Sequence, residues 1–151
     1  MRRAHSVTIT SFVKPEEDLE QARQAFLSLI PFPLEEERLA LDEAVAKGFN
    51  DRSITVLSLK LEKERHTNAF LANLSSRLSG AQKQQLLEQE DRLDARLDYF
   101  LRFRKQDLPL LVLTDKGECV HVKISLAAFP KSRERALAII KEVFSDVNDN
   151  P

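Results

Sequence analysis

Apolar and polar positions alternate along two stretches of the N-terminal half of the chain. Residues 4–13 place small or apolar side chains on one side and polar side chains on the other, and many of them are β-branched. This period-two pattern predicts a half-buried strand. A second strand is predicted over residues 53–63. Its apolar parity slips between Val56 and Leu57, which indicates either a bulge or a strand covered on both faces.

Four helices are predicted where apolar residues recur at a spacing of three and four. Pro15 is expected to open the first helix, because its fixed φ suits a first turn and the acids after it suit the helix dipole. Thr67 is expected to cap the second helix, Ser79 and Gln82 to form a capping box for the third, and Ser132 to cap the last. The expected buried stripes are Leu19, Ala22, Phe26 and Leu29, then Phe70, Leu71, Leu74 and Leu78, then Leu86 and Leu87, and finally Ala136, Ile139, Ile140 and Val143.

The C-terminal half contains the clearest strand pattern. Residues 97–104 alternate, residues 110–113 form an apolar run, residues 115–118 have turn composition, and residues 120–126 alternate again. We therefore expect a β-hairpin that joins the run 110–113 to the strand after it. Residues 34–47 fit a strand by their period and a helix by their Glu and Ala content, and both alternatives stay open at this point.

The order of these elements predicts the fold class. Hairpins and helices with a single apolar face indicate an α+β domain, in which an antiparallel sheet carries helices mainly on one face. The sequence contains no repeat and no linker composition. We therefore expect one domain over residues 1–147 and a frayed tail over residues 148–151.

Composition excludes several classes of protein. The apolar fraction of 42% and the charged fraction of 31% exclude a disordered chain, and no apolar run approaches the ~18 residues of a membrane span. Cys119 is the only cysteine, so no intrachain disulfide is expected. The basic residues at the N-terminus lack the apolar region of a secretory signal. We expect a cytoplasmic protein that has no membrane partner.

Charge is distributed unevenly along a chain of net charge −1. Residues 15–46 contain two cations and nine acids, whereas residues 99–135 contain eight cations and four acids. This separation indicates either one basic and one acidic face or an ordinary solvated surface. The overall balance is unfavourable for nucleic-acid binding, which relies on cations that neutralise phosphates.

Residues with catalytic or metal-binding chemistry are few. His5, His66 and His121 are scattered, the glycines form no phosphate-binding loop, and one cysteine makes no zinc motif. Cys119 and His121 share a strand face and form a conceivable nucleophilic dyad, although a structural pair is the favoured interpretation. We therefore expect no enzyme activity, no cofactor and no metal.

The polar face of the C-terminal strands is the more informative group. Arg102 and Arg104 lie opposite the apolar stripe of one strand, and His121 and Lys123 opposite that of another. Cations on a sheet face suit phosphates, and Phe12 or Phe100 would offer a surface for base stacking. The alternative is the solvated polar face that any antiparallel sheet produces.

A second basic group surrounds the start of the predicted last helix. Lys131, Arg133 and Arg135 lie where acids are normally favoured by the helix dipole. Unpaired backbone N–H groups at this position favour an anion, and nearby cations would add to that preference. The alternative is that Glu134 and neighbouring acids neutralise the three cations.

Two segments of this half resemble a known family. Residues 99–106, YFLRFRKQ, resemble its YLRFDKQ-type strand, and residues 121–131, HVKISLAAFPK, resemble its HVKIxxAAYPK signature. The family comprises small archaeal RNA-binding proteins, formerly a domain of unknown function and predicted to be exosome-associated. The resemblance implies an RNA ligand, a strand within residues 34–47 and a fold similar to the ribosomal protein that binds 5S RNA. Arg104 departs from the pattern by replacing an acid, and residues 48–53 keep the Gly-Asn-Pro turn only loosely.

These observations predict a non-catalytic RNA-binding protein that acts in RNA processing or is associated with the exosome. Its expected contacts to the RNA backbone are Arg102, Arg104, His121, Lys123, Lys131, Arg133 and Arg135. The alternative is an interaction subunit of an RNA-processing assembly, whose acidic segment 15–46 docks on a basic protein partner. A hydrolase or nuclease is a third hypothesis, for which the sequence offers no preferred carboxylate.

Overall fold

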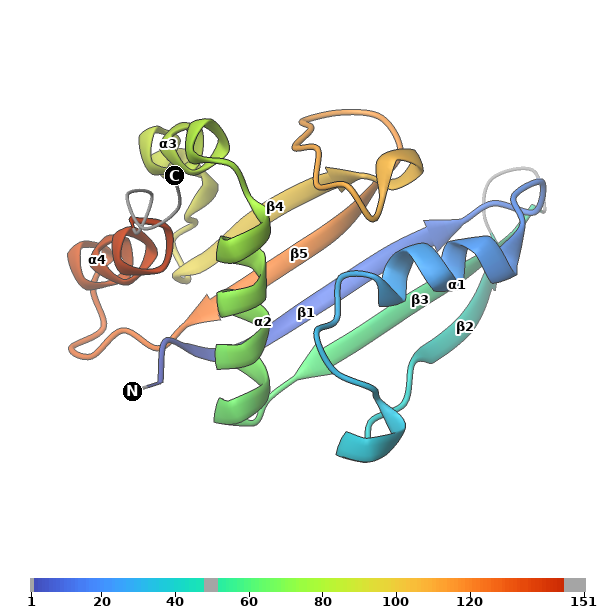
Figure 1. Ribbon diagram of the computed structural model, residues 1–151, viewed down its shortest axis with the longest axis horizontal. Coiled ribbons are helices and arrows are strands. Elements are labelled where there is room, and N and C mark those ends of the chain that lie inside the picture. The colour runs from blue at the N-terminus through green and yellow to red at the C-terminus, as the bar shows by residue number, and fades with distance from the viewer. Residues whose placement is uncertain (1, 48–51, 146–151) are drawn as a thin grey trace. The chain divides into compact units, whose positions relative to one another are not determined.

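The computed structural model describes residues 2–47 and 52–145 and forms an α+β fold. In chain order its elements are β1 (Ala4–Val13), α1 (Leu19–Leu27), η1 (Glu35–Glu37), β2 (Asp42–Lys47), β3 (Ser53–Leu61), α2 (Glu64–Arg77), α3 (Gly80–Glu88), η3 (Glu90–Arg92), β4 (Asp98–Arg104), η4 (Lys105–Asp107), β5 (Cys119–Leu126) and α4 (Arg133–Phe144). The strands form an antiparallel sheet in the order β2-β3-β1-β5-β4 (Figure 1). The predicted fold class is therefore confirmed, whereas the likeness to the ribosomal protein that binds 5S RNA stays a prediction.

The chain divides into two compact units. The first unit comprises Met1–Val7, Leu61–Leu101 and Lys123–Pro151, and the second comprises Thr8–Lys60 and Arg102–Val122. The expectation of one domain over residues 1–147 stays a prediction, and the expected tail 148–151 lies outside the described residues. None of the helices in the described part of the chain is long and apolar enough to cross a membrane.

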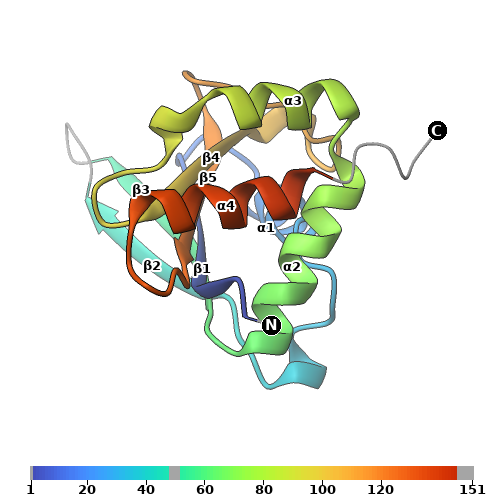
Figure 2. The same cartoon turned by 90° about the vertical axis from the view of Figure 1, so that its left-hand side faces the viewer.

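Helices α2, α3 and α4 pack together in the first unit. Helix α4 packs against α2 and α3 (Figure 2), and the buried hydroxyl of Ser75 in α2 donates to the carbonyl of Val143 at 2.9 Å. Tyr99 of β4 donates its hydroxyl to the carbonyl of Leu86 in α3, and its ring lies 6.3 Å from that of Phe144 in α4. Helices α3 and α4 therefore cover the Tyr99 side of β4.

Helix α1 covers one face of the second unit. Arg23 of α1 donates to the carboxylate of Glu43 in β2 at 2.9 Å, and Figure 1 shows the helix crossing in front of β1 and β3. Strand residues on that side, such as Ile9 and Leu57, are fully buried. Burial of such side chains contributes ~1.5–3 kcal/mol each to folding.

The change of apolar parity in β3 is not a bulge. Strands β2 and β3 pair without interruption from Asp42 with Ser58 to Lys47 with Ser53. Val56 is half-buried on one face, whereas Leu57 is buried on the other. The strand is therefore apolar on both faces along this stretch. The strand expected within residues 34–47 is confirmed over Asp42–Lys47 and is preceded by the 3₁₀ turn Glu35–Glu37.

Two predicted helix starts are wrong. Helix α1 begins at Leu19, because the carboxylate of Asp18 accepts hydrogen bonds from two backbone N–H groups of the first turn, and Pro15 lies in the turn before it. Helix α2 begins before Thr67, with Lys63 at the N-cap position. Thr67 is fully buried inside the helix, where its hydroxyl donates back to the carbonyl of Glu64. Interior threonines commonly make this bond.

The predicted hairpin between residues 110–113 and β5 is also wrong. Strand β5 neighbours β4 and β1, and residues 110–113 form no strand. Leu113 makes an isolated bridge to Phe103 at the free edge of β4, and Leu110 is 68% exposed. The tight turn is present, and Gly117 adopts a φ of 87° there, a conformation that favours glycine.

The predicted caps of α3 and α4 are confirmed. The hydroxyl of Ser79 accepts from the N–H of Gln82 at 3.1 Å, and the side chain of Gln82 accepts from the N–H of Ser79 at 2.9 Å. Ser132 accepts from the N–H of Arg135 in the same way at 3.1 Å.

Replacing Ser79 by Ala removes one half of the capping box and should lower the free energy of unfolding by ~1 kcal/mol. Urea denaturation followed by circular dichroism measures this decrease. Ser76→Ala is the matched control, because the exposed hydroxyl of Ser76 only donates back to the carbonyl of Asn73, so a change within ~0.5 kcal/mol is expected. Equal decreases in both variants would contradict the capping role.

Candidate functional site

One face of β4 carries exposed cations in the second unit. Arg102 and Arg104 are exposed, while Phe103 between them is fully buried. Alternation along a pleated strand therefore directs both guanidinium groups away from the core. Arg104 pairs with Asp107 at 3.2 Å. Arg102 donates to the backbone carbonyl of Asp115 at 3.2 Å, a neutral acceptor that leaves its charge uncompensated by that contact.

His121 of β5 extends this face toward β1. Its ring meets the ring of Phe12 edge to face, with centroids 6.1 Å apart and an interplanar angle of 82°. Burial, and then the positive charge of Arg102, lowers the pKa of His121 below its usual 6.5. The lowered pKa favours the neutral imidazole at pH 7, so His121 offers a hydrogen-bonding group there. Arg102, Arg104 and His121 are called the sheet-face cluster below.

Cys119 lies beside His121, with 3.6 Å between the sulfur and Nε2. Burial raises the pKa of the Cys119 thiol, although Arg102 and Lys105 act in the opposite direction. Reactive cysteines need a lowered pKa, because the thiolate is the nucleophile. The raised pKa of the thiol therefore favours the structural interpretation of this pair over a catalytic dyad.

Lys123 belongs to the first unit, further along β5. Its ammonium group is 3.7 Å from the carboxylate of Asp98, and the same carboxylate accepts a hydrogen bond from Ser125 at 2.7 Å. The positive charge of Lys123 is therefore partly balanced by the protein itself.

The helix-start cluster, Lys131, Arg133 and Arg135, is exposed at the start of α4 in the first unit. Arg133 donates to the carbonyls of Leu93 and Glu90, at 3.0 and 2.8 Å. This residue thus fastens the segment before β4 to α4. Glu134 places one acid in the same first turn.

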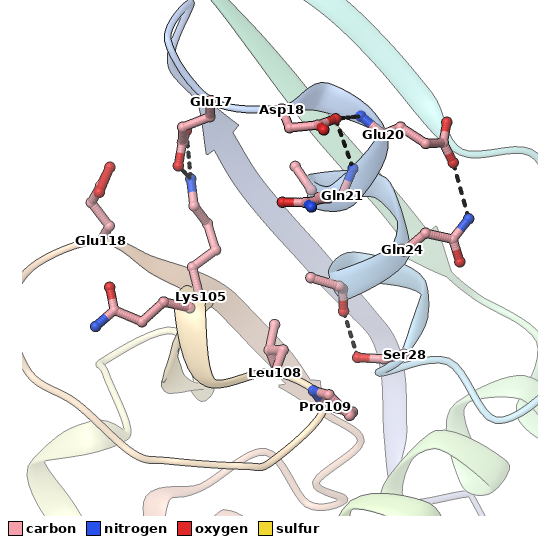
Figure 3. Close-up of a pocket in the computed structure, with 13 residues that line it drawn as sticks. Glu17, Asp18, Glu20, Gln21, Gln24, Ser28, Lys105, Leu108, Pro109 and Glu118 are labelled. Carbon is pink, nitrogen blue, oxygen red and sulfur yellow. Dashed lines mark hydrogen bonds and ion pairs between the residues drawn. The ribbon is translucent and has the colours of Figure 1, made fainter.

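A groove of about 710 Å³ lies between α1 and the segment after β4 in the second unit (Figure 3). Its lining includes four acids, Glu17, Asp18, Glu20 and Glu118. Lys105 enters it almost buried, with 10% of its side chain exposed, and pairs with Glu17 at 3.0 Å. An anionic ligand is disfavoured by so many carboxylates.

Lys105 also holds the backbone of β1, a role that our sequence interpretation missed. Its ammonium group donates to the carbonyl of Phe12 at 2.6 Å, so the lysine after β4 fixes the residue whose ring meets His121. A pattern of exposed cations gives no sign of such a role, because it depends on which strands lie together. Phe12 itself was only one of two aromatic residues considered, and it is 50% exposed.

Comparison with known proteins identifies relatives over most of the chain. A family model described as RNA binding matches residues 6–126. An RNA-binding protein of Pyrococcus abyssi is 26% identical over 142 residues, which cover 92% of this chain and 92% of that protein.

Solved structures of similar proteins also match most of the chain. A DUF54 protein from Methanothermobacter thermautotrophicus has a TM-score of 0.76 and 26% identity, over 94% of this chain and 98% of its own. A DUF54 protein from Archaeglobus fulgidus has a TM-score of 0.80 and 27% identity, over 93% of this chain and 99% of its own. Because the family model spans β1 to β5, the chain belongs to the RNA-binding (DUF54) family.

Proposed function

We propose that this chain is a non-catalytic RNA-binding protein that contacts the RNA backbone through the sheet-face cluster and the helix-start cluster. Membership of the RNA-binding family supports RNA as the ligand. The observation that carries the proposal is the exposed face of β4. Arg102 on this face donates to a backbone carbonyl, and within the described residues no carboxylate pairs with its guanidinium group. Guanidinium groups bind phosphate oxygens well, because their donors match the geometry of the anion.

We propose a different role for each of these residues. Arg102 and Arg104 contribute charge on the sheet face, and His121 contributes hydrogen bonds at neutral pH. Lys123 adds a partly balanced charge further along β5. At the helix start, Lys131 and Arg135 are the proposed phosphate contacts, while Arg133 fixes the loop beside them.

A role in RNA processing, an association with the exosome and a cytoplasmic location belong to the same proposal. The first two rest on the resemblance of residues 99–106 and 121–131 to the family signatures. The location rests on the single cysteine and on the lack of an apolar run of membrane-spanning length.

An interaction with a basic protein partner is the second candidate, and the acidic groove beside α1 is the observation that favours it. Affinity purification from native lysate, with and without nuclease, separates the two functions. Protein partners that survive nuclease, together with an absence of RNA crosslinks to this chain, would replace RNA binding by this alternative. Loss of every partner on nuclease treatment would support direct RNA contact.

The double substitution Arg102→Gln with Arg104→Gln should weaken RNA binding and its salt dependence. Removing one phosphate-binding cation lowers the slope of log K against log salt by ~0.7 for single strands and ~0.9 for duplexes. Fluorescence anisotropy with a labelled RNA hairpin carrying single-stranded tails, from ~50 to ~200 mM salt, measures both quantities.

Lys47→Gln is the matched control for this removal of charge. Lys47 pairs with Ser53 in the register of β2 and β3, on the side of Glu43, which contacts α1. Its removal should leave the salt slope unchanged. A wild-type Kd above ~100 μM at low salt, or a slope near zero, would refute the proposed function, since binding to phosphates releases counterions.

His121→Gln should make stability less dependent on pH. The lowered pKa of folded His121 means that the unfolded chain binds the proton more readily. The free energy of unfolding therefore falls as the pH drops through the usual histidine value of 6.5, and the decrease is complete below the folded pKa. Urea denaturation between pH ~7.5 and ~5 should show a smaller decline in the variant.

The exposed His5 provides the control for this measurement, as His5→Gln makes the same substitution outside the sheet-face cluster. Identical pH dependence in wild type and His121→Gln would show that the environment of His121 does not disfavour its charge.

A further inference from the structure

Phe12 is an aromatic residue in an unusual place. It lies on β1, the middle strand of the order β2-β3-β1-β5-β4, and half of its surface is exposed. Its neighbours Ser11 and Val13 are buried on the opposite face, so the pleat of the strand directs the Phe12 ring to the side without α1. Single exposed apolar residues are common on protein surfaces and need no explanation by themselves, so the surroundings of the ring decide its role.

Two contacts hold Phe12 in place. The His121 ring packs against it edge to face, and the ammonium group of Lys105 fixes its backbone carbonyl at 2.6 Å. An exposed ring on a flexible loop would lose conformational freedom on binding a ligand. A ring that is already held on a strand avoids most of that cost.

The groups around the ring are polar and cationic rather than apolar. His121 offers an imidazole on β5, and Arg102 lies on the neighbouring strand β4; burial, and then the charge of Arg102, lowers the pKa of that imidazole. On β1 the preceding outward residue is Thr10, a hydroxyl donor and acceptor. An apolar protein surface would leave these polar and cationic groups without hydrogen-bonding partners. A nucleotide fits each part, because its base has an apolar face, its sugar and base edges form hydrogen bonds, and its phosphate is anionic.

We propose that Phe12 stacks on one unpaired base of single-stranded RNA, with His121 contacting the same nucleotide and Arg102 a neighbouring phosphate. This inference rests on the proposed RNA-binding function and narrows its ligand to unpaired RNA. Bases inside a duplex are stacked on each other and leave no free face for the ring, so a duplex would use only the cations.

The test compares a labelled single-stranded oligouridylate with a fully paired RNA duplex of equal length, by fluorescence anisotropy with the full chain. The wild type should bind the single strand more tightly. Phe12→Ala should weaken that binding about tenfold, since base–aromatic stacking is worth ~1–3 kcal/mol. The salt slope should stay unchanged, because this variant keeps every phosphate-binding cation, whereas Arg102→Gln should reduce it by ~0.7.

Conservative variants separate stacking from packing. Phe12→Tyr keeps an aromatic face and should bind within about twofold of wild type, whereas Phe12→Leu keeps apolar volume and should resemble Phe12→Ala. Leu110→Ala removes another exposed apolar side chain and should change nothing. Far-UV circular dichroism and thermal melting establish that each variant is folded.

The outcomes distinguish the two proposals. Salt-dependent RNA binding that is equal in wild type, Phe12→Ala and Phe12→Leu, or that favours the duplex, overturns the stacking role and leaves the backbone contacts intact. Absence of RNA binding by the wild type overturns both.

Discussion

The site in the second unit depends on the ammonium group of Lys105. It donates to the carbonyl of Phe12 and to the carboxylate of Glu17, and only 10% of its side chain is exposed. Burial of a cation without such partners would cost several kcal/mol, so these two acceptors stabilise Lys105 in this position. One side chain therefore fixes the end of β1, the turn before α1 and the segment after β4.

A chain of net charge −1 cannot attract RNA by its overall field, so local groups have to supply the affinity. Several of those groups already have partners. Arg104 pairs with Asp107, Lys123 lies near Asp98, and Arg133 donates to two carbonyls. Removing these cations would change the free energy of unfolding as well as RNA affinity. Contacts that do not depend on charge, such as stacking and hydrogen bonds, therefore gain importance in this protein.

Local patterns predicted the local structure well. Alternation identified β1, β4 and β5, and the spacing of Ser79 and Gln82 identified the start of α3, because strand pleating and capping boxes depend on neighbours in the sequence. Predictions failed where another residue or strand took the place that the pattern had assigned. The carboxylate of Asp18 caps α1 in place of the start expected at Pro15. The run 110–113 has the composition of a strand, yet β5 already has β4 and β1 on its two sides.

The order of the strands could not be predicted from such patterns, and the site depends on it. Phe12 and His121 meet because β1 lies next to β5, a pairing between segments far apart in the chain. The predicted polar face contained cations from β4 and β5. The sequence offered Phe12 and Phe100 as equal candidates for base stacking. The structure places the ring of Phe12 edge to face against the ring of His121, on the strand beside β4. The pairing of β1 with β5 therefore adds an aromatic ring to a set of basic residues, and the proposed stacking on that ring would discriminate between unpaired and paired RNA where charge alone would not.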